Sequence, residues 1–489
     1  MTRESFAAFL EAGVVAFLLV VLLFADGARA LSLSVIGSSL REIAAVLRDP
    51  GTQWMVFLCL GIYFTAFLFL RSWAVSGFWR ATNPSLWLAL GLFIGAIFYA
   101  FSYSPSLDAL TLLAGAVLGQ GLAAWANFEI RNAKPETRNR FGVLVVSLLL
   151  ILLALASIWR KYTGAYFAYR NHARWSGPWD NPNIFGLLMG VGVTLALGGV
   201  VSSFPFSVFS KPEAGSWKLR IKRYAIIILC FLAVVLMGGG LLHSYSRGAW
   251  LATFCGFVYL AFQVIKNSHF QQIRTVHWIH TNKVSLVVII CAITVLAFWQ
   301  FQQPQHPVVR RASSVGNVND FSWRNRVAAW EGALQMMAEK PWLGFGWNQP
   351  EPMYEHYYLP PKSTESAAIR MNDYLMLGAT LGIPALFCYA TYIWLCLTRS
   401  GFRVPSLGGL APKPRDRGTP NKDCSPTSGS NFGLLTSDFL PAVCRAGAIV
   451  LLVGFWFDGG LFILSTAATF WILLELGAAK LPQTKVVPS

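Results

Sequence analysis

A short basic motif, Ser246-Arg247-Gly248, stands between two apolar segments, 224–242 and 248–265, with almost no loop on either side. If both segments cross a membrane, the guanidinium of Arg247 lies at the membrane boundary. The planar fork of an arginine binds phosphate oxygens through paired hydrogen bonds and stays charged. Arg247 is therefore a candidate clamp for a diphosphate, and the simpler alternative is an interfacial arginine that snorkels to water.

A second polar cluster lies between the apolar segments 141–158 and 183–201, and it contains Arg174, Asn181 and Asn183. Either asparagine can cap the helix that follows. Because the amino end of a helix also favours anions, Arg174 and Asn183 are candidate phosphate ligands. The aromatic residues around them suit sugar rings, but they are also ordinary residues of a membrane interface.

A long polar segment, 302–370, carries Arg324 and Arg326, and both arginines are candidate substrate ligands. Apolar side chains then recur at helical spacing, which predicts an amphipathic helix that ends before Pro341. The apolar positions of this helix are Val327, Trp330, Leu334 and Met337. The helix either lies at the membrane surface over a cavity or packs on the remaining helices.

The last candidate pair is Asn372-Asp373, at the entry to the apolar segment 372–397. A carboxylate near the membrane surface can pair with an arginine or act as a general base. Asn372 is therefore a candidate substrate-binding residue, and Asp373 is a candidate catalytic residue.

The composition indicates which elements must position these residues. The chain has 489 residues, of which 55% are hydrophobic and 12% are charged, whereas about 25% are charged in a soluble globular protein. Apolar runs of about 18 residues or more are typical of transmembrane helices. Twelve such runs lie near 6–24, 53–70, 85–103, 107–126, 141–158, 183–201, 224–242, 248–265, 284–301, 372–397, 439–456 and 459–477. They lack the alternation of barrel strands, so we expect one all-α polytopic membrane domain over 1–489.

The charge distribution predicts how this domain is oriented. Cytoplasmic loops collect lysine and arginine, and more than half of the 39 basic residues fall on one side when both termini are cytoplasmic. This orientation makes 302–370 a periplasmic loop between the ninth and tenth spans. It also explains the net charge of +17 without a nucleic-acid partner.

Three further features complete the organisation. The segment 400–438, rich in Pro, Gly, Ser, Lys and Arg, is predicted to be a disordered cytoplasmic loop. Arg3, the first apolar run and Ala28-Arg29-Ala30 are also compatible with a cleaved signal peptide, which would leave eleven spans. None of the 8 cysteines falls in a predicted outer loop, so no disulfide framework is expected.

Taken in order, these motifs resemble the O-antigen ligase and polymerase superfamily over roughly residues 140–400. The resemblance is carried by Arg174-x-x-Gly177 with Asn181-Pro182-Asn183, by Ser246-Arg247-Gly248-Ala249, by Arg-x-x-x-Trp-x-x-Ala-Leu at Arg326 with Pro-x-x-Gly-x-Gly ending at Gly346, and by Asn372-Asp373-Tyr374-Leu375. It implies a GT-C-like membrane glycosyltransferase that works without a metal or other cofactor. The predicted outer loops contain no Asp-x-Asp pair.

One position departs from this family. Its ligases usually carry a histidine directly before the asparagine that is Asn372 here, and this chain has Met371 instead. A methionine cannot usefully exchange a proton. His243, His356 and His172 are candidate replacements for that base, and Asp373 is another.

The resemblance implies transfer of a glycan from an undecaprenyl-diphosphate carrier to a glycan, lipid or protein acceptor at the outer face of the bacterial inner membrane. The alternatives are an O-antigen or exopolysaccharide polymerase and a protein O-oligosaccharyltransferase. A non-catalytic binder of lipid-linked glycans and a transporter are also open. Transporters often show internal repeats and ionisable residues in mid-membrane, whereas the charge here gathers at the predicted outer rim.

Overall fold

The structure is a computed structural model that describes residues 3–24, 84–100, 106–132, 140–159, 173–203, 217–269, 321–360, 365–398 and 439–478. All helices and turns of helix in these residues are as follows: α1 (Arg3–Phe24), α4 (Pro84–Ala100), α5 (Leu107–Asn132), α6 (Arg140–Ile158), η3 (Gly177–Trp179), α7 (Pro182–Ser203), α8 (Trp217–His243), α9 (Arg247–His269), α13 (Phe321–Glu339), α14 (Pro350–Met353), η5 (Tyr354–Tyr358), η6 (Ser366–Met371), α15 (Asp373–Thr398), α16 (Leu440–Phe457) and α17 (Leu464–Ala478). The described part of the chain contains no β-strand.

Ten of the twelve predicted apolar segments coincide with helices. The other two, 53–70 and 284–301, lie outside the described residues, as does 400–438. Among the described residues, five helices are long and apolar enough to cross a membrane, judged by length and composition: α6, α7, α8, α15 and α16. The prediction of an all-α membrane protein is confirmed at this level. The count of twelve spans and the GT-C-like arrangement stay predictions.

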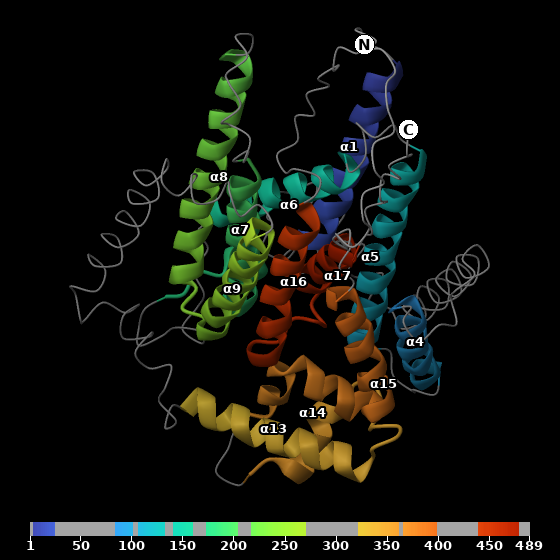
Figure 1. Cartoon of the computed structure of the whole chain (residues 1–489). Helices are drawn as coiled ribbons and strands as arrows, with labels where there is room; N and C mark the ends of the chain where they lie inside the picture. Colours follow the sequence, from blue (N-terminus) through green and yellow to red (C-terminus); the bar gives the residue numbers. More distant parts are fainter. Residues whose placement is uncertain are drawn as a thin grey trace, which may run out of the picture.

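Helix α7 lies at the centre of the helical bundle. It packs against α6, α8, α9 and α16, and 83% of the residues in its apolar stretch are buried. A helix that is apolar on every side belongs in a protein core or in a membrane, and α7 is the helix of this bundle that other helices surround. Figure 1 shows α13 and α14 lying across one end of the molecule, beyond α9, α16 and α15. We call this the α13 end.

Helix α15 coincides with the predicted span at 372–397 and is broken inside it. Gly382 inside it has φ 82° and ψ 171°, a conformation that costs little only for glycine. A Cβ atom at this position would lie 2.5 Å from the carbonyl oxygen of Trp342. Pro384 follows, and a proline has no N–H to continue the helical hydrogen bonds.

The glycine-rich turn after α13 is seated in this break. The carbonyl of Thr380 lacks its helical partner because that partner is Pro384, and it accepts the backbone N–H of Gly346 at 2.9 Å instead. The carbonyl of Ala379 accepts the backbone N–H of Phe345 at 2.8 Å. The turn therefore satisfies backbone groups that the broken helix leaves open.

Helix α13 has a small hydrophobic core of its own. The predicted helix is confirmed, and of its predicted apolar positions Met337 is buried, whereas Leu334 is 54% exposed. The buried residues of this core are Ala329, Ala333, Met336, Met337, Tyr354, Ala368, Ile369, Met376 and Ala379. Small side chains allow the buried face of α13 to pack closely, since a Cβ atom at Gly332 would lie 2.4 Å from the Tyr354 ring. The helical spacing of the large apolar residues did not predict this close approach.

Candidate functional site

The turn between α8 and α9 places the first basic motif at the α13 end. Tyr245 in this turn has φ 51°, which is uncommon for an aromatic residue and requires support from its surroundings. Burial raises the pKa of its phenol, which therefore stays neutral. Ser246 then caps α9, because its Oγ accepts the backbone N–H of Ala249 at 3.1 Å. Arg247 is the first residue of α9 and is half-buried.

Asp458, in the short turn between α16 and α17, faces this helix start. Its Oδ2 accepts a hydrogen bond from the Ser246 hydroxyl, and its Oδ1 accepts one from Nη2 of Arg326 at 3.0 Å. The approach is close, since a Cβ atom at Gly248 would lie 2.4 Å from the carboxylate. An anionic group at the amino end of a helix is stabilised by the helix dipole. The structure thus joins α9, α13 and the α16–α17 turn through one carboxylate.

Arg326 is the cation at the centre of this cluster, with a side chain only 12% exposed. Besides Asp458, its Nη2 lies 3.8 Å from Sδ of Met371. The side chain where family ligases carry a histidine therefore touches this arginine. Arg324, two residues earlier on the same helix, is exposed.

Three buried nitrogen donors near this ion pair have no hydrogen-bond partner among the described residues. They are Nε of Arg326, Nε1 of Trp330 and Nδ2 of Asn372. Trp330 lies one helical turn beyond Arg326, and Asn372 directly follows Met371. Buried donors without acceptors are costly, so the cluster is suited to a ligand that carries several acceptor oxygens.

Asp373 and Asn372 hold the neighbouring backbone. Oδ1 of Asn372 accepts the backbone N–H of Leu375 at 3.0 Å, and this bond caps α15. Oδ2 of Asp373 accepts the backbone N–H of Leu461 at 2.7 Å. The Asp373 carboxylate is thus 2% exposed and fixes the far side of the turn that begins with Asp458. This geometry gives Asp373 a positioning task, and its catalytic role stays a prediction.

Arg174, Asn181 and Asn183 form a polar cluster that holds the backbone of the α8–α9 turn. Nε of Arg174 donates to the carbonyl of Ser244 at 2.7 Å, and Nη2 donates to Oδ1 of Asn183 at 2.6 Å. Asn181 is the residue that caps α7, since its Oδ1 accepts the backbone N–H of Asn183 at 2.9 Å. Of the two asparagines considered for the cap, the structure selects Asn181 and leaves Asn183 to orient the arginine.

The histidines considered as bases occupy other environments. The ring of His243 stacks on Trp175 with centroids 4.6 Å apart, and its Nδ1 lies 2.8 Å from the carbonyl oxygen of Gly239. His356 is exposed on η5, where its ring meets the edge of Tyr357. His172 lies outside the described residues. The contacts of the two described histidines are with these neighbours rather than with Arg326 or Asp458.

Arg370 ties the polar segment to the bundle. Its Nε donates to the Glu351 carboxylate of α14, and its Nη1 lies 3.4 Å from Oδ2 of Asp108 on α5. Burial lowers the pKa of this guanidinium, but the two carboxylates outweigh that effect and raise it. The side chain is 47% exposed, so both contacts are surface ion pairs rather than buried ones.

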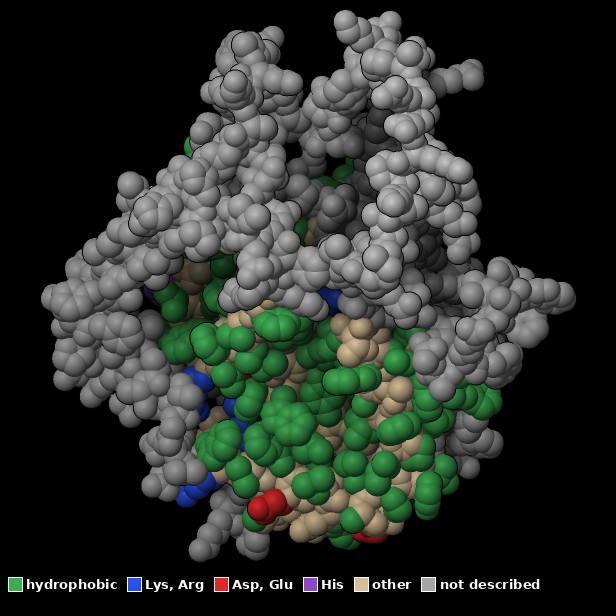
Figure 2. Space-filling model, viewed as in Figure 1, with side chains coloured by type: hydrophobic (Ala, Val, Ile, Leu, Met, Phe, Trp, Pro, Cys, Tyr) green, Lys and Arg blue, Asp and Glu red, His purple; other side chains and the backbone are tan. Residues whose placement is uncertain are grey.

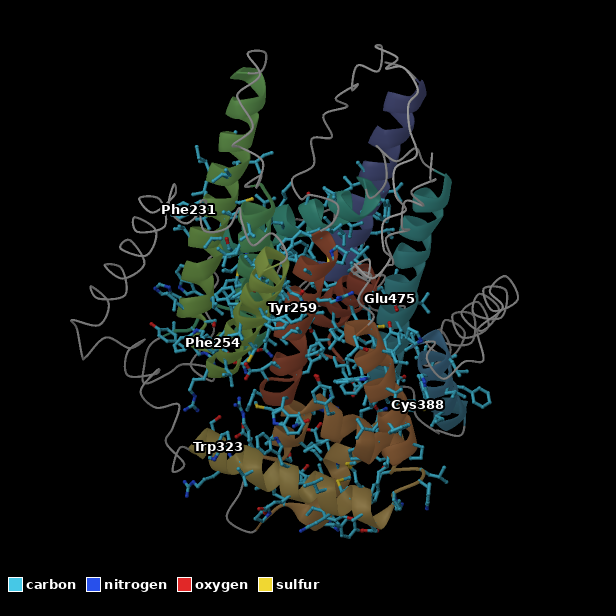
Figure 3. All side chains as sticks on the ribbon, viewed as in Figure 1. Phe231, Phe254, Tyr259, Trp323, Cys388 and Glu475 are labelled. Carbon is cyan, nitrogen blue, oxygen red and sulfur yellow. The ribbon has the colours of Figure 1, made fainter. Side chains whose placement is uncertain are left out.

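The cations of the site lie on one side of the α13 end. Figure 2 shows Lys and Arg side chains gathered over the lower end of α9 and the start of α13. The basic residues of those two segments are Arg247, Arg324 and Arg326. In Figure 3, Trp323 marks the start of α13, below the helix that carries Phe254. Among the described residues, no group of three or more His, Cys, Asp or Glu side chains is arranged to hold a metal.

Sequence reasoning missed Asp458 and the role of Ser246. The available signal was an acidic residue in a very short turn between two apolar segments, followed by Gly459 and Gly460. A charge confined between two spans is costly unless it has a partner. The sequence suggested Asp373 as the carboxylate that pairs with an arginine, whereas in the structure Asp458 makes this pair with Arg326.

The fold and this site define an all-α membrane protein with a cationic, partly buried site at one end of its helices. Residues 232–390 match the family model described as O-antigen ligase. The matched segment runs from α8 into α15 and includes Arg247, Arg326 and Asn372. The match confirms the resemblance to the O-antigen ligase and polymerase superfamily over this segment. The match supports a glycan-processing membrane enzyme of the ligase or polymerase type. The comparison with curated proteins finds no matching relative.

Proposed function

We propose that this protein is an O-antigen ligase-like glycosyltransferase. It transfers a glycan from an undecaprenyl-diphosphate carrier to an acceptor at the outer face of the inner membrane, and the α13 end is that outer face. The observation that carries the proposal is the Arg326–Asp458–Ser246 cluster at the start of α9, with Arg247 beside it and unmatched buried donors around it. Such a site offers charge and hydrogen bonds to a diphosphate.

An apolar cavity supports the assignment of a lipid carrier. It lies between α15, α16 and α17 and has a volume of about 290 Å³. Its lining residues include Tyr374 and Leu461, which adjoin the turn that Asp373 fixes. A carrier whose diphosphate rests at the cation cluster therefore has an apolar space for part of its chain close by.

In the proposed reaction the bond between the anomeric carbon and the diphosphate oxygen breaks, and the diphosphate leaves with the electron pair. Arg247 and Arg326 stabilise the charge that develops on it, an effect that is large in a partly dehydrated site. The acceptor hydroxyl forms the new bond, with inversion expected from the family resemblance, and loses its proton. We assign that proton to Asp458, because its carboxylate becomes available when Arg326 turns to the diphosphate.

A second candidate is a non-catalytic binder of lipid-linked glycans. Met371 favours it, because this side chain stands beside Arg326 at the position where family ligases carry a histidine. In that case the site would hold the carrier without transferring the glycan.

One experiment tests the proposal and separates the two candidates. Purified protein in nanodiscs receives an undecaprenyl-diphosphate-linked oligosaccharide, with and without acceptor, and the release of undecaprenyl diphosphate is measured. We expect release that requires the acceptor and is lost in Arg247→Ala, while this variant keeps the elution profile of the wild type. Wild-type release by Arg247→Ala would refute the clamp. Tight binding without release would favour the non-catalytic binder.

A further inference from the structure

The turn formed by residues 340–347 carries two of the most exposed large apolar side chains of the described chain. Trp342 is 74% exposed and Leu343 is 63% exposed. The turn is not loosely held, because Ile383 of α15 donates its backbone N–H to the carbonyl of Pro341 at 2.8 Å. Two exposed apolar side chains on a fixed backbone indicate a contact surface.

This surface continues a stripe on α15. Beyond the break at Gly382, the exposed large residues of α15 are Ile383, Phe387 and Trp394, at 47%, 58% and 66%. In a helix of 3.6 residues per turn these three lie within about 40° of one another. Since α15 is apolar enough to cross a membrane, an exposed stripe of this kind suits contact with lipid. Trp342 and Leu343 extend it at the α13 end.

A second tryptophan of the same turn shows the contrast. Trp347 is 3% exposed, and its Nε1 donates to the carbonyl of Gly95 on α4 at 3.1 Å. The turn is thus anchored between two apolar helices, α4 and α15. One of its tryptophans fastens it to the protein, and the other points away from the protein.

The turn also begins with a cation. Lys340 is exposed, and its Nζ lies 4.3 Å from the centroid of the Phe345 ring. A lysine next to tryptophan and leucine is the combination that binds the head-group region of a bilayer, where the ammonium meets lipid phosphates and the rings enter the acyl boundary.

We propose that the 340–347 turn inserts Trp342 and Leu343 into the lipid leaflet at the α13 end, with Lys340 at the level of the lipid phosphates. The turn is then a membrane anchor for α13. Because α13 carries Arg326, the anchor fixes the height of this arginine relative to the bilayer. The inference concerns contact with lipid and does not depend on the proposed reaction.

The test places an environment-sensitive fluorophore at Leu343→Cys in the full-length protein, reconstituted in nanodiscs of phosphatidylcholine and phosphatidylglycerol. The matched control is Glu355→Cys, an exposed position on η5 of the same polar segment. Labelling of the unsubstituted protein corrects for native cysteines. Lipids with a nitroxide near the head group should quench the label at 343 several-fold more than the label at 355. Aqueous iodide should show the reverse order.

Two outcomes would overturn the proposal. Equal quenching by iodide at both positions would place the turn in water. Shielding of position 343 from iodide and from nitroxide lipids alike would mean that protein covers it. Neither outcome bears on glycan transfer, and both label sites are exposed, so the substitutions do not disturb packing.

Discussion

The two ends of α16 and α17 both bury charged side chains, but they use them differently. We call the end of these helices that lies away from α13 the inner end. There, Nε of Arg445 donates to the carbonyl of Gly477 at 2.8 Å, and Tyr392 donates its hydroxyl hydrogen to the Glu475 carboxylate. A cation on the last carbonyls of a helix is an ordinary cap. At the α13 end, Asp458 joins three chain segments and the nearby donors lack acceptors among the described residues.

The difference shows that burial of a charge does not by itself mark a functional site. The inner cluster carries out a structural task that the helix ends themselves require. The α13 cluster offers more donors than the described protein atoms use, as the proposed binding of a diphosphate would require. In Figure 3, Glu475 lies well away from Trp323 and α13, so substitutions can test the two clusters separately.

The largest expected effect distinguishes two arginines of one helix. Arg326→Ala should lower acceptor-dependent release of undecaprenyl diphosphate by about 100-fold or more, because loss of one charge-stabilising donor typically has that effect. Arg324→Ala, which changes the exposed neighbour, should lower this release by less than about tenfold, because solvent and salt screen an exposed charge. Initial rates in nanodiscs measure both. Equal losses would mean that the ion pair with Asp458 does not define the site.

Asp458→Asn should have the next largest effect. The substitution keeps the shape and can still accept from Ser246, but it removes the negative charge beside Arg326 and the proposed base. We expect turnover to fall by about 100-fold, with binding of the lipid-linked donor kept or strengthened. Ser246→Ala is the matched control, because it removes the hydrogen bond to Asp458 and the cap of α9 but leaves the carboxylate in place. Unchanged turnover in Asp458→Asn would exclude this carboxylate as the base.

Substitution at the inner end should affect stability and not transfer. Arg445→Met removes the hydrogen bond to the Gly477 carbonyl, which should cost about 1–3 kcal/mol of folding free energy. Thermal unfolding in detergent measures the loss, and turnover per folded molecule should equal that of the wild type. A selective fall in turnover would mean that the two ends are coupled.

The smallest expected effect comes from Met371→His. Histidine restores the residue type of family ligases beside Arg326, and only its neutral form accepts a proton. A histidine with the ordinary pKa of about 6.5 would therefore add activity above that pH and lose the gain below it. The pH profile of release, compared with that of Met371→Gln, measures the change. A large gain would indicate that the wild type lacks an effective base and would favour the non-catalytic binder.

The sequence by itself determined the helical membrane class, because long apolar runs in a chain of this composition have few other stable structures. It also located Arg247, Arg326 and Asn372, since residue type and spacing sufficed for a family resemblance. It could not determine that Leu334 of α13 is exposed, because the close approach at Gly332 is to Tyr354 of a separate segment, η5.

Only the tertiary structure decided which charges meet. Asp458 lies 132 residues from Arg326 and 212 from Ser246, and no local pattern encodes a pairing at such separations. The break in α15 was also decided there, since the turn after α13 satisfies the carbonyls that Gly382 and Pro384 leave open. Local propensity selects the elements of this protein, whereas the fit between distant segments determines its site.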